Sequence, residues 1–256
     1  MTESLGLLEP AVWLLLGILS AGILVQAAAG FAGGLVIVPL MLWAGYSVPE
    51  AQSALLVATI PQNVAGVWSF RDAIEPNRLV GPAMGRLIAL PIGVAALQWM
   101  ESASMVLLRQ LVGGCVLAAT LATWWLRPTQ RDSVAPFWGC LAFPTSGFLQ
   151  GIVGMGGPVM VFWVQAHRWD TRQSRGFLFA MYLVSIVPAM IILYLFFGGR
   201  IVAPGLIAGM AIPWLLVVTQ MGLRLGTWLG TERLRRVTLV LLFLIGLTGL
   251  LTPLLR

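Results

Sequence analysis

The sequence predicts an all-α polytopic membrane protein with two inverted-topology repeats, each made of a glycine-broken helical hairpin plus three transmembrane helices. The first observation is composition: the 256-residue chain is 59% hydrophobic and only 9% charged, whereas a soluble domain carries about 25% charged residues. Apolar stretches long enough to cross a bilayer, roughly 20 residues each, fill nearly the whole chain. The other two observations are a duplicated glycine-rich break and an uneven distribution of arginine.

Five apolar segments are expected in the first half, and one of them is too short to span a membrane. They are Ala11–Ala29, Leu35–Ala44, Ala51–Phe70, Leu79–Trp99 and Met105–Leu126. The start of the chain lacks the positively charged region of a signal peptide, so we interpret the first segment as part of the mature membrane domain. The second segment directly follows a glycine-rich break and would be about 15 Å long, at about 1.5 Å per residue.

Five further segments are expected in the second half, in the same order. They are Pro136–Val153, Val159–Ala166, Gly176–Phe197, Ile201–Met221 and Val237–Leu251. The short segment again follows a glycine-rich break, Gln150–Pro158, which repeats Gln26–Gly34. With the two glutamines aligned, the matching glycine pairs are Gly30 with Gly154 and Gly33 with Gly157. Broken backbone at membrane depth must face protein, water or a ligand, and a duplicated break indicates a transporter binding site.

The placement of arginine predicts the topology. If each broken hairpin returns to the side from which it entered, eleven of the fifteen arginines fall in loops on one side; the loops are Arg71–Arg78, Arg127–Arg131, Arg168–Arg175 and Arg224–Arg236. If each hairpin instead crosses once, the fourteen arginines other than Arg86 divide six against eight, which is almost no bias. Because cytoplasmic loops carry an excess of basic residues, we expect the first arrangement, with both termini outside.

This topology divides the chain into two repeats of opposite orientation. Each half then has an odd number of direction changes, so the halves face opposite ways. We expect residues 1–130 to form the N-terminal repeat and residues 131–256 the C-terminal inverted repeat. The two glycine breaks would enter the membrane from opposite faces and meet near its midplane.

At these breaks the chain resembles the TauE/SafE family of bacterial membrane permeases, also called the sulfite exporter family. The resemblance rests on the GFAGG…P stretch Gly30–Pro39 and the GxxGMGGP stretch Gly151–Pro158, one early in each half, and it covers nearly the whole chain. One departure is that Phe31–Gly34 stands where the second copy has Met155–Pro158, which leaves open whether the two sites are equivalent. The resemblance implies a multi-pass protein of the bacterial inner membrane, and the arginine distribution then predicts that both termini are periplasmic. It also implies export or uptake of small anions, often sulfur compounds such as sulfite, sulfoacetate and other sulfonates, sulfate and thiosulfate.

The candidate anion site lies where the two short helices begin. A helix N-terminus offers unpaired N–H groups and about half a positive charge, and glycine lets backbone approach a ligand without a Cβ clash. The expected backbone contacts are Gly30, Gly33, Gly34, Gly154, Gly156 and Gly157. The alternative is close helix packing through small residues.

Two glutamines and one arginine are expected at the same site. Gln26 and Gln150 precede the breaks at equivalent positions, where their amides can donate to an anion or tie down loose backbone. Arg86 is the one arginine inside a span. It is either a counter-charge for the anion or a side chain that snorkels toward the cytoplasmic headgroups.

A polar cluster in the third segment is a further candidate. Thr59, Gln62 and Asn63 lie mid-span around Pro61, which frees a backbone carbonyl. These side chains either line the substrate site or form hydrogen bonds between helices.

The sequence predicts a secondary transporter that moves a small anion, a sulfur oxyanion or organosulfonate such as sulfite or sulfoacetate, by alternating access. A passive anion channel and a transporter of small carboxylates are the alternatives. One histidine and two isolated cysteines argue against an enzyme, and we expect neither a metal nor a cofactor. The expected partners are the small anion and membrane lipid. Coupled protons or other ions, and the oligomeric state, are left open, and no nucleic-acid-binding pattern occurs.

Overall fold

The chain is all-helical, as predicted, in the computed structural model, which describes residues 10–29, 32–125, 129–132 and 134–251. The helices are α1 (Pro10–Ala29), α2 (Gly33–Trp43), α3 (Val48–Phe70), η1 (Arg71–Ala73), α4 (Pro76–Ala103), α5 (Met105–Trp125), α6 (Pro136–Val153), α7 (Gly157–Gln165), α8 (Thr171–Phe197), η2 (Gly198–Ile201), α9 (Val202–Met210) and α10 (Ile212–Leu251). Among the described residues, the only β-type pairing is one bridge between Arg131 and His167.

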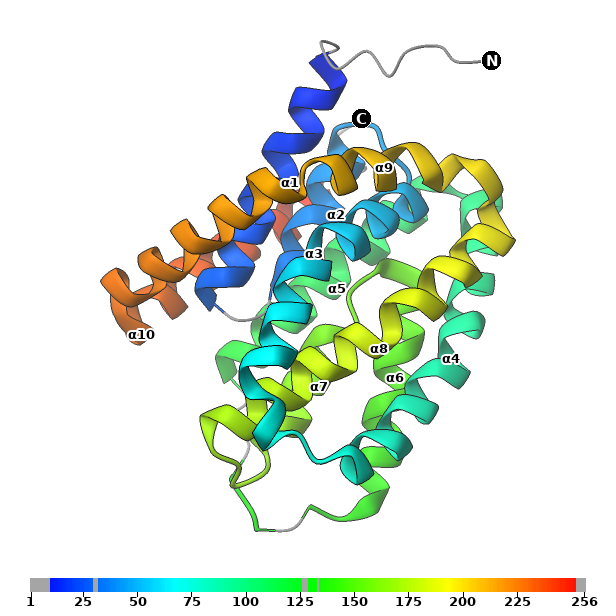
Figure 1. Cartoon of the computed structure of the whole chain (residues 1–256). Helices are drawn as coiled ribbons and strands as arrows, with labels where there is room; N and C mark the ends of the chain where they lie inside the picture. Colours follow the sequence, from blue (N-terminus) through cyan, green and yellow to red (C-terminus); the bar gives the residue numbers. More distant parts are fainter. Residues whose placement is uncertain (1–9, 30–31, 126–128, 133, 252–256) are drawn as a thin grey trace.

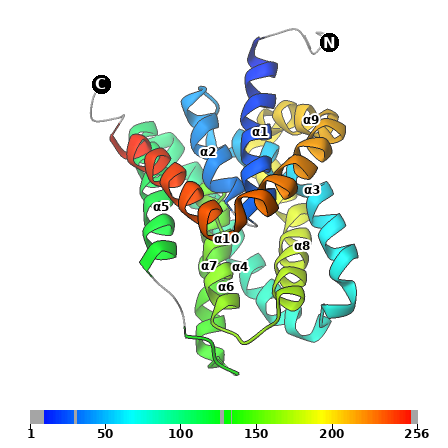
Figure 2. The same cartoon turned by 90° about the vertical axis from the view of Figure 1, so that its left-hand side faces the viewer.

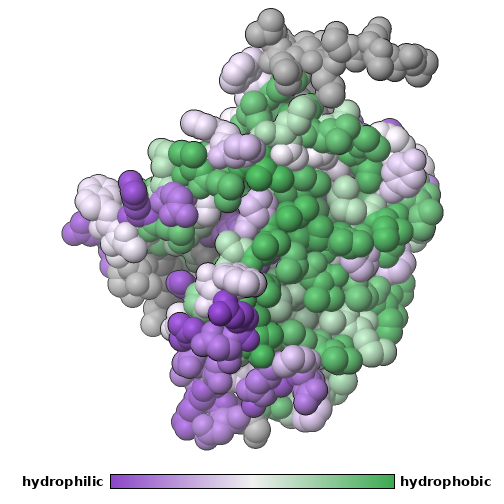
Figure 3. Space-filling model, in the orientation of Figure 1, coloured by the Kyte–Doolittle hydropathy of each residue, from purple (hydrophilic) through white to green (hydrophobic). Residues whose placement is uncertain are grey.

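Several helices are suited to a bilayer. Four stretches are long and apolar enough to cross a membrane: α1, α4, α5 and the run Thr171–Met210, which joins α8 to α9. Shorter apolar helices are α2 and the last part of α10, Arg236–Leu251. Figure 3 shows a broad hydrophobic surface on one face, with hydrophilic residues gathered at the lower end and along the left edge. The chain is therefore a multi-pass membrane protein.

The helices pack in pairs. α3 packs against α8 on one face of the molecule (Figure 1), and α4 packs along α6. α10 is bent, so that its first part packs along α1 and its last part along α5 (Figure 2). These contacts form a large core in which α2 is almost completely buried, and a smaller cluster of α6, α7 and α8 residues around Phe143 and Met160.

The two short helices begin where the sequence predicts them, directly after the glycine breaks. α1 ends at Ala29 and α2 begins at Gly33, while α6 ends at Val153 and α7 begins at Gly157. Among the described residues, each break contains one in the left-handed region, but at different positions. In the second break it is a glycine, Gly154, with φ 73°, which costs little. In the first it is Ala32, with φ 84°, a conformation that crowds its Cβ.

Two boundaries expected in the second half are wrong. The segment Ile201–Met221 is divided at Ala211, because Pro213 has no N–H to donate to the carbonyl four residues earlier. The expected loop Arg224–Arg236 is instead helical, and α10 runs through it with a bend at Gly230, where φ is 70° and ψ is 163°. The bend lets the two arms of α10 pack on different helices, a long-range requirement that local sequence does not reveal.

Three of the four arginine-bearing loops come together at one end of the molecule. Arg172 pairs with Asp72 at 2.9 Å, which joins the start of α8 to η1. The backbone N–H of Arg131 donates to the carbonyl of Ala166, and Arg168 pairs with Asp132. The fourth expected loop is the bent middle of α10. Arg127 lies outside the described residues.

Candidate functional site

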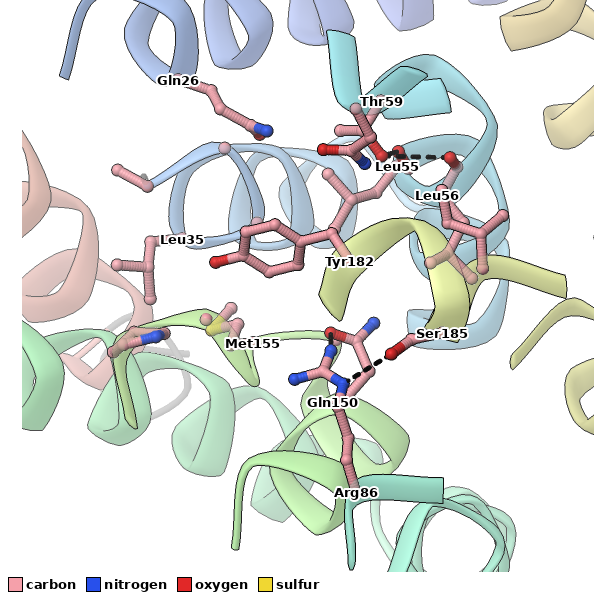
Figure 4. Close-up of a pocket in the computed structure, with 18 residues that line it drawn as sticks. Gln26, Leu35, Leu55, Leu56, Thr59, Arg86, Gln150, Met155, Tyr182 and Ser185 are labelled. Atoms are coloured by element: carbon pink, nitrogen blue, oxygen red, sulfur yellow. Dashed lines mark hydrogen bonds between the residues drawn. The ribbon is translucent and has the colours of Figure 1, made fainter. Parts of the chain in front are cut away.

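The two glycine breaks lie against each other in the centre of the molecule. A Cβ placed on Gly34 would stand only 3.0 Å from the carbonyl oxygen of Gly154. A cavity of about 70 Å³ opens beside this contact (Figure 4). Nine of the residues expected from the sequence line it: Gln26, Gly33, Gly34, Thr59, Asn63, Arg86, Gln150, Gly154 and Gly157. The fold thus brings together side chains from α1, α3, α4 and α6 with both helix starts.

The position of Arg86 depends on very close packing of α4 against α6. Gly147 of α6 faces the backbone carbonyl of Arg86, and any Cβ at Gly147 would collide with it. Gly151, one turn later, meets the carbonyl of Leu90 in the same way, with only 2.5 Å left for a Cβ. Small residues allow helices in membranes to approach to this extent. The arginine side chain can therefore reach polar groups on the inner face of α6.

The guanidinium of Arg86 is held by four uncharged acceptors. Its Nε donates to Ser185 Oγ at 2.9 Å, and Nη1 donates to Ser146 Oγ and to the sulfur of Met160 at 3.1 Å. Nη2 donates to Gln150 Oε1 at 3.4 Å (Figure 4). Since a guanidinium has five N–H groups, one on Nη2 remains available.

No carboxylate balances this charge in the described part of the chain. None of the ion pairs found there involves Arg86, although the residue is only 1% exposed. The side chain therefore does not snorkel to a headgroup, and the second of the two expected roles is excluded. A buried, unbalanced cation beside a cavity can bind an anion.

Gln150 and Ser146 tie the second break to the arginine. Gln150 Oε1 accepts the N–H of Gly156 at 3.4 Å as well as the guanidinium. Ser146 accepts from Arg86 and donates to the carbonyl of Gly156 at 2.7 Å. The oxygen of Gln150 thus stabilises the broken backbone, one of its two expected roles. Its amide nitrogen forms no hydrogen bond with a described residue and stays available to a ligand.

Tyr182 of α8 contacts both the arginine and the start of α7. Its hydroxyl oxygen lies 2.6 Å from where a Cβ of Gly157 would stand, so any larger residue at Gly157 would displace it. The guanidinium carbon of Arg86 lies 5.9 Å from the centre of the Tyr182 ring, within cation–π range. The hydroxyl group makes no hydrogen bond with the described residues and faces the cavity.

The α3 side of the cavity is polar but uncharged. The hydroxyl of Thr59 donates to the carbonyls of Leu55 and Leu56, both at 3.0 Å, and its lone pairs stay free. Asn63 is 2% exposed and lines the cavity. Its Oδ1 has no hydrogen-bond partner among the described residues.

Three expected residues do not line the cavity. Gln62 lies on another face of α3, with its Oε1 also buried and unpartnered in the described structure. Gly156 is buried behind the break, where its N–H and carbonyl are both bonded. Gly30 lies outside the described residues.

Sequence reasoning missed Ser146 and Gln52, and it gave Tyr182 and Ser185 only as a less polar counterpart of the cluster around Pro61. Ser146 precedes Gln150 by one helical turn, a spacing visible in the sequence but not distinctive there. Tyr182 and Ser185 stand out only as polar residues of one apolar helix, and Ser185 lies 99 positions from its partner Arg86. Gln52, 1% exposed, donates to the carbonyl of Gly151 at 3.0 Å and so supports the second break from α3.

This arrangement is suited to binding rather than to bond chemistry. No group of three or more His, Cys, Asp or Glu side chains able to hold a metal occurs among the described residues. The lining residues offer one permanent cation, several neutral hydrogen-bond donors and the starts of two helices. Such a donor set surrounds an anion and holds it without a reactive group.

Comparison with known proteins identifies the family of the chain. The family model described as "Sulfite exporter TauE/SafE" matches residues 14–249. A curated relative from Cupriavidus necator, named "Probable sulfite/organosulfonate exporter TauE", is 25% identical over 235 residues, which cover 90% of each chain. No solved structure matches the chain. The chain therefore belongs to the TauE/SafE sulfite exporter family, whose members are membrane transporters and not enzymes.

Proposed function

We propose that this chain is a secondary carrier that moves a small sulfur oxyanion or organosulfonate across the bacterial inner membrane by alternating access. The substrate binds in the cavity between the two glycine breaks, with its oxyanion group against Arg86. Membrane lipid surrounds the apolar helices, and protons or other ions are candidates for coupling. The relative from Cupriavidus necator, named as a sulfite/organosulfonate exporter, supports the sulfur chemistry.

One observation carries the proposal: the buried guanidinium of Arg86 faces the cavity with only neutral partners. Burying an unpaired charge is costly, so such a residue in a membrane usually has a functional partner. An anionic substrate supplies the missing negative charge. The free N–H on Nη2, the amide nitrogen of Gln150 and the Tyr182 hydroxyl are available to donate to its oxygens.

The helix starts add to this positive environment. Gly33 and Gly34 begin α2, and Gly157 begins α7; all three line the cavity. The first N–H groups of a helix have no partner within it and attract negative charge. The buried Asn63, whose Oδ1 has no hydrogen-bond partner among the described residues, also supports a ligand in this cavity.

Alternating access follows from an arrangement in two inverted repeats, residues 1–130 and 131–256. Equivalent helix pairs support this division: α4 packs along α6 through glycines of α6, and the first part of α10 packs along α1 through Gly222 and Gly226. α3 and α8, which take the same place in each half, contact each other. Rocking of one half against the other would expose the central cavity to each side in turn.

The proposal is tested by replacing the arginine. Arg86→Gln keeps a polar side chain but removes the charge, so the dissociation constant for sulfite or methanesulfonate should rise about 10–100-fold, since charge-assisted hydrogen bonds are worth about 1.5–3 kcal/mol. Binding is measured by calorimetry on detergent-purified protein. Arg78→Gln, an exposed arginine paired with Glu75, is the matched control and should bind normally.

An unchanged affinity in Arg86→Gln would overturn the proposal. Transport in proteoliposomes separates a carrier from an anion channel, because a carrier shows counterflow and a channel does not. Acetate tested beside methanesulfonate separates a sulfonate site from a carboxylate site. Equal or tighter acetate binding would reassign the substrate class.

A further inference from the structure

The side of the cavity opposite Arg86 has polar groups that a simple oxyanion does not use. Asn63 is only 2% exposed, lines the cavity, and leaves its amide without a hydrogen bond to any described residue. A buried amide without a partner is destabilising, so its retention indicates a ligand group that pairs with it. The nearby Thr59 oxygen can still accept a hydrogen bond, because only its proton is used.

These groups are separated from the arginine. Figure 4 shows Gln26 and Thr59 on one side of the cavity and Arg86, Gln150 and Ser185 on the other, with the ring of Tyr182 between them. Gln26 of α1 forms no hydrogen bond with a described residue. The cavity therefore has a cationic end and an uncharged amide end, on different helices.

The charges limit what the amide end can bind. Arg86 is the only ionised side chain among the described lining residues. A second anionic group at the amide end would have no counter-charge, and a cationic group would have no carboxylate. A hydroxyl or similar neutral group can both donate to and accept from an amide.

The cavity limits the ligand to a small molecule. Its volume is about 70 Å³, whereas one water takes about 30 Å³ of the liquid.

We propose that the preferred substrate is a singly charged organosulfonate whose far end carries an uncharged hydrogen-bonding group, and that Asn63 recognises this group. This inference rests on the proposed function, because it places the sulfonate against Arg86. It adds a specificity residue and a second recognition element. Sulfite and a dianion with a second carboxylate are then weaker ligands.

The test compares two ligands of nearly equal size, ethanesulfonate and 2-hydroxyethanesulfonate, by calorimetry on the purified full-length chain. Wild type should bind the hydroxylated ligand at least about tenfold more tightly, because a site built for a hydroxyl rejects the analogue that lacks it. Asn63→Leu is a change of similar volume. In this variant the two ligands should bind about equally tightly, and the affinity for ethanesulfonate should stay within about twofold of the wild-type value. Asn77→Leu, the same substitution at an exposed position of α4, should keep the full preference.

Each outcome is decisive. Equal binding of the two ligands by wild type overturns the inference and indicates that water alone occupies the amide end, even if Asn63→Leu does not fold. Tighter binding of sulfite or sulfoacetate than of 2-hydroxyethanesulfonate also overturns it. If no sulfonate and no sulfite binds, the proposed function itself fails. The assignment is supported if Asn63→Leu loses the preference for the hydroxylated ligand and Asn77→Leu keeps it.

Discussion

At the scale of single residues, the candidate site contains a cation that has hydrogen bonds but no counter-ion within the described parts of the chain. Neutral acceptors orient the guanidinium of Arg86 and keep its charge available. A carboxylate in their place would neutralise the arginine and compete with a substrate anion. The acceptors therefore determine the geometry of the site, and the arginine provides its charge.

Ser146 provides the sharpest test at this scale, because it connects the arginine to the second break. Ser146→Ala leaves the Gly156 carbonyl and one guanidinium N–H without their partner. We expect a loss of about 1–3 kcal/mol in stability and weaker anion binding, since buried unpaired groups carry that cost. Thermal unfolding in detergent and calorimetry measure the two effects.

The matched control is Ser102→Ala. Its hydroxyl is exposed and bonds only to the carbonyl of Trp99 within the same helix. It should change stability by less than about 0.5 kcal/mol and leave binding unaltered. If Ser146→Ala behaves like this control, Ser146 does not support the site.

At the scale of elements, glycines determine how closely the helices approach. Gly147 and Gly151 bring α6 onto α4, and Gly113 brings α5 onto the last part of α10. Lipid provides no hydrophobic drive for helices to associate, so close van der Waals contact has to hold them together. A larger residue at one of these glycines would therefore move the helices apart and change the shape of the cavity.

Adjacent glycines in α5 test this packing. A Cβ on Gly113 would stand 2.6 Å from the backbone nitrogen of Leu250 and 2.7 Å from the carbonyl carbon of Gly249, whereas a Cβ on Gly114 meets nothing within 4 Å. Gly113→Ala should lower stability by about 1–3 kcal/mol through overpacking. Gly114→Ala should raise stability by up to about 1 kcal/mol, because alanine is the better helix former.

Thermal unfolding of both variants checks the prediction. A Tm for Gly113→Ala at or above that of wild type would contradict the contact between α5 and α10. Because both variants add one methyl group to the same helix, their expression levels and detergent binding should be equal.

Element boundaries were predictable only where their cause is local. The starts of α2 and α7 follow from glycine-rich breaks, and the structure confirms them. The course of α10 was not predictable, because its bend at Gly230 serves contacts with both α1 and α5. Arginines at positions 224 and 236 indicate a polar environment, which a loop and a bent helix satisfy equally well.

At the scale of the whole molecule, ion pairs join segments at both ends. The pair between Asp72 and Arg172 lies at the end that carries most of the arginine loops, and the pair between Glu101 and Arg200 joins the end of α4 to η2. The start of α1 and the end of α10 both lie in the upper part of the molecule in Figure 2. This arrangement supports the proposed topology with both termini on one side.

Reporter fusions test this topology. Alkaline phosphatase fused to either end of the full chain should be active, because both termini are proposed to be periplasmic. Green fluorescent protein exported by the general secretory route should stay dark in the same positions. Activity at one terminus and fluorescence at the other would contradict the even number of crossings and with it the inverted repeats.

The sequence by itself determined the membrane class, the helical fold and the two breaks, because hydropathy and glycine clusters are properties of neighbouring residues. It also predicted Arg86, Gln150 and Asn63 as candidate site residues, since polar groups within apolar segments are few. Only the tertiary structure decided that Arg86 is buried rather than snorkelling, and that Ser146 and Ser185 hold it. Those partners lie 60 and 99 positions away, and they meet the arginine because helices α4, α6 and α8 pack closely enough around one cavity, an approach that depends on contacts between distant segments.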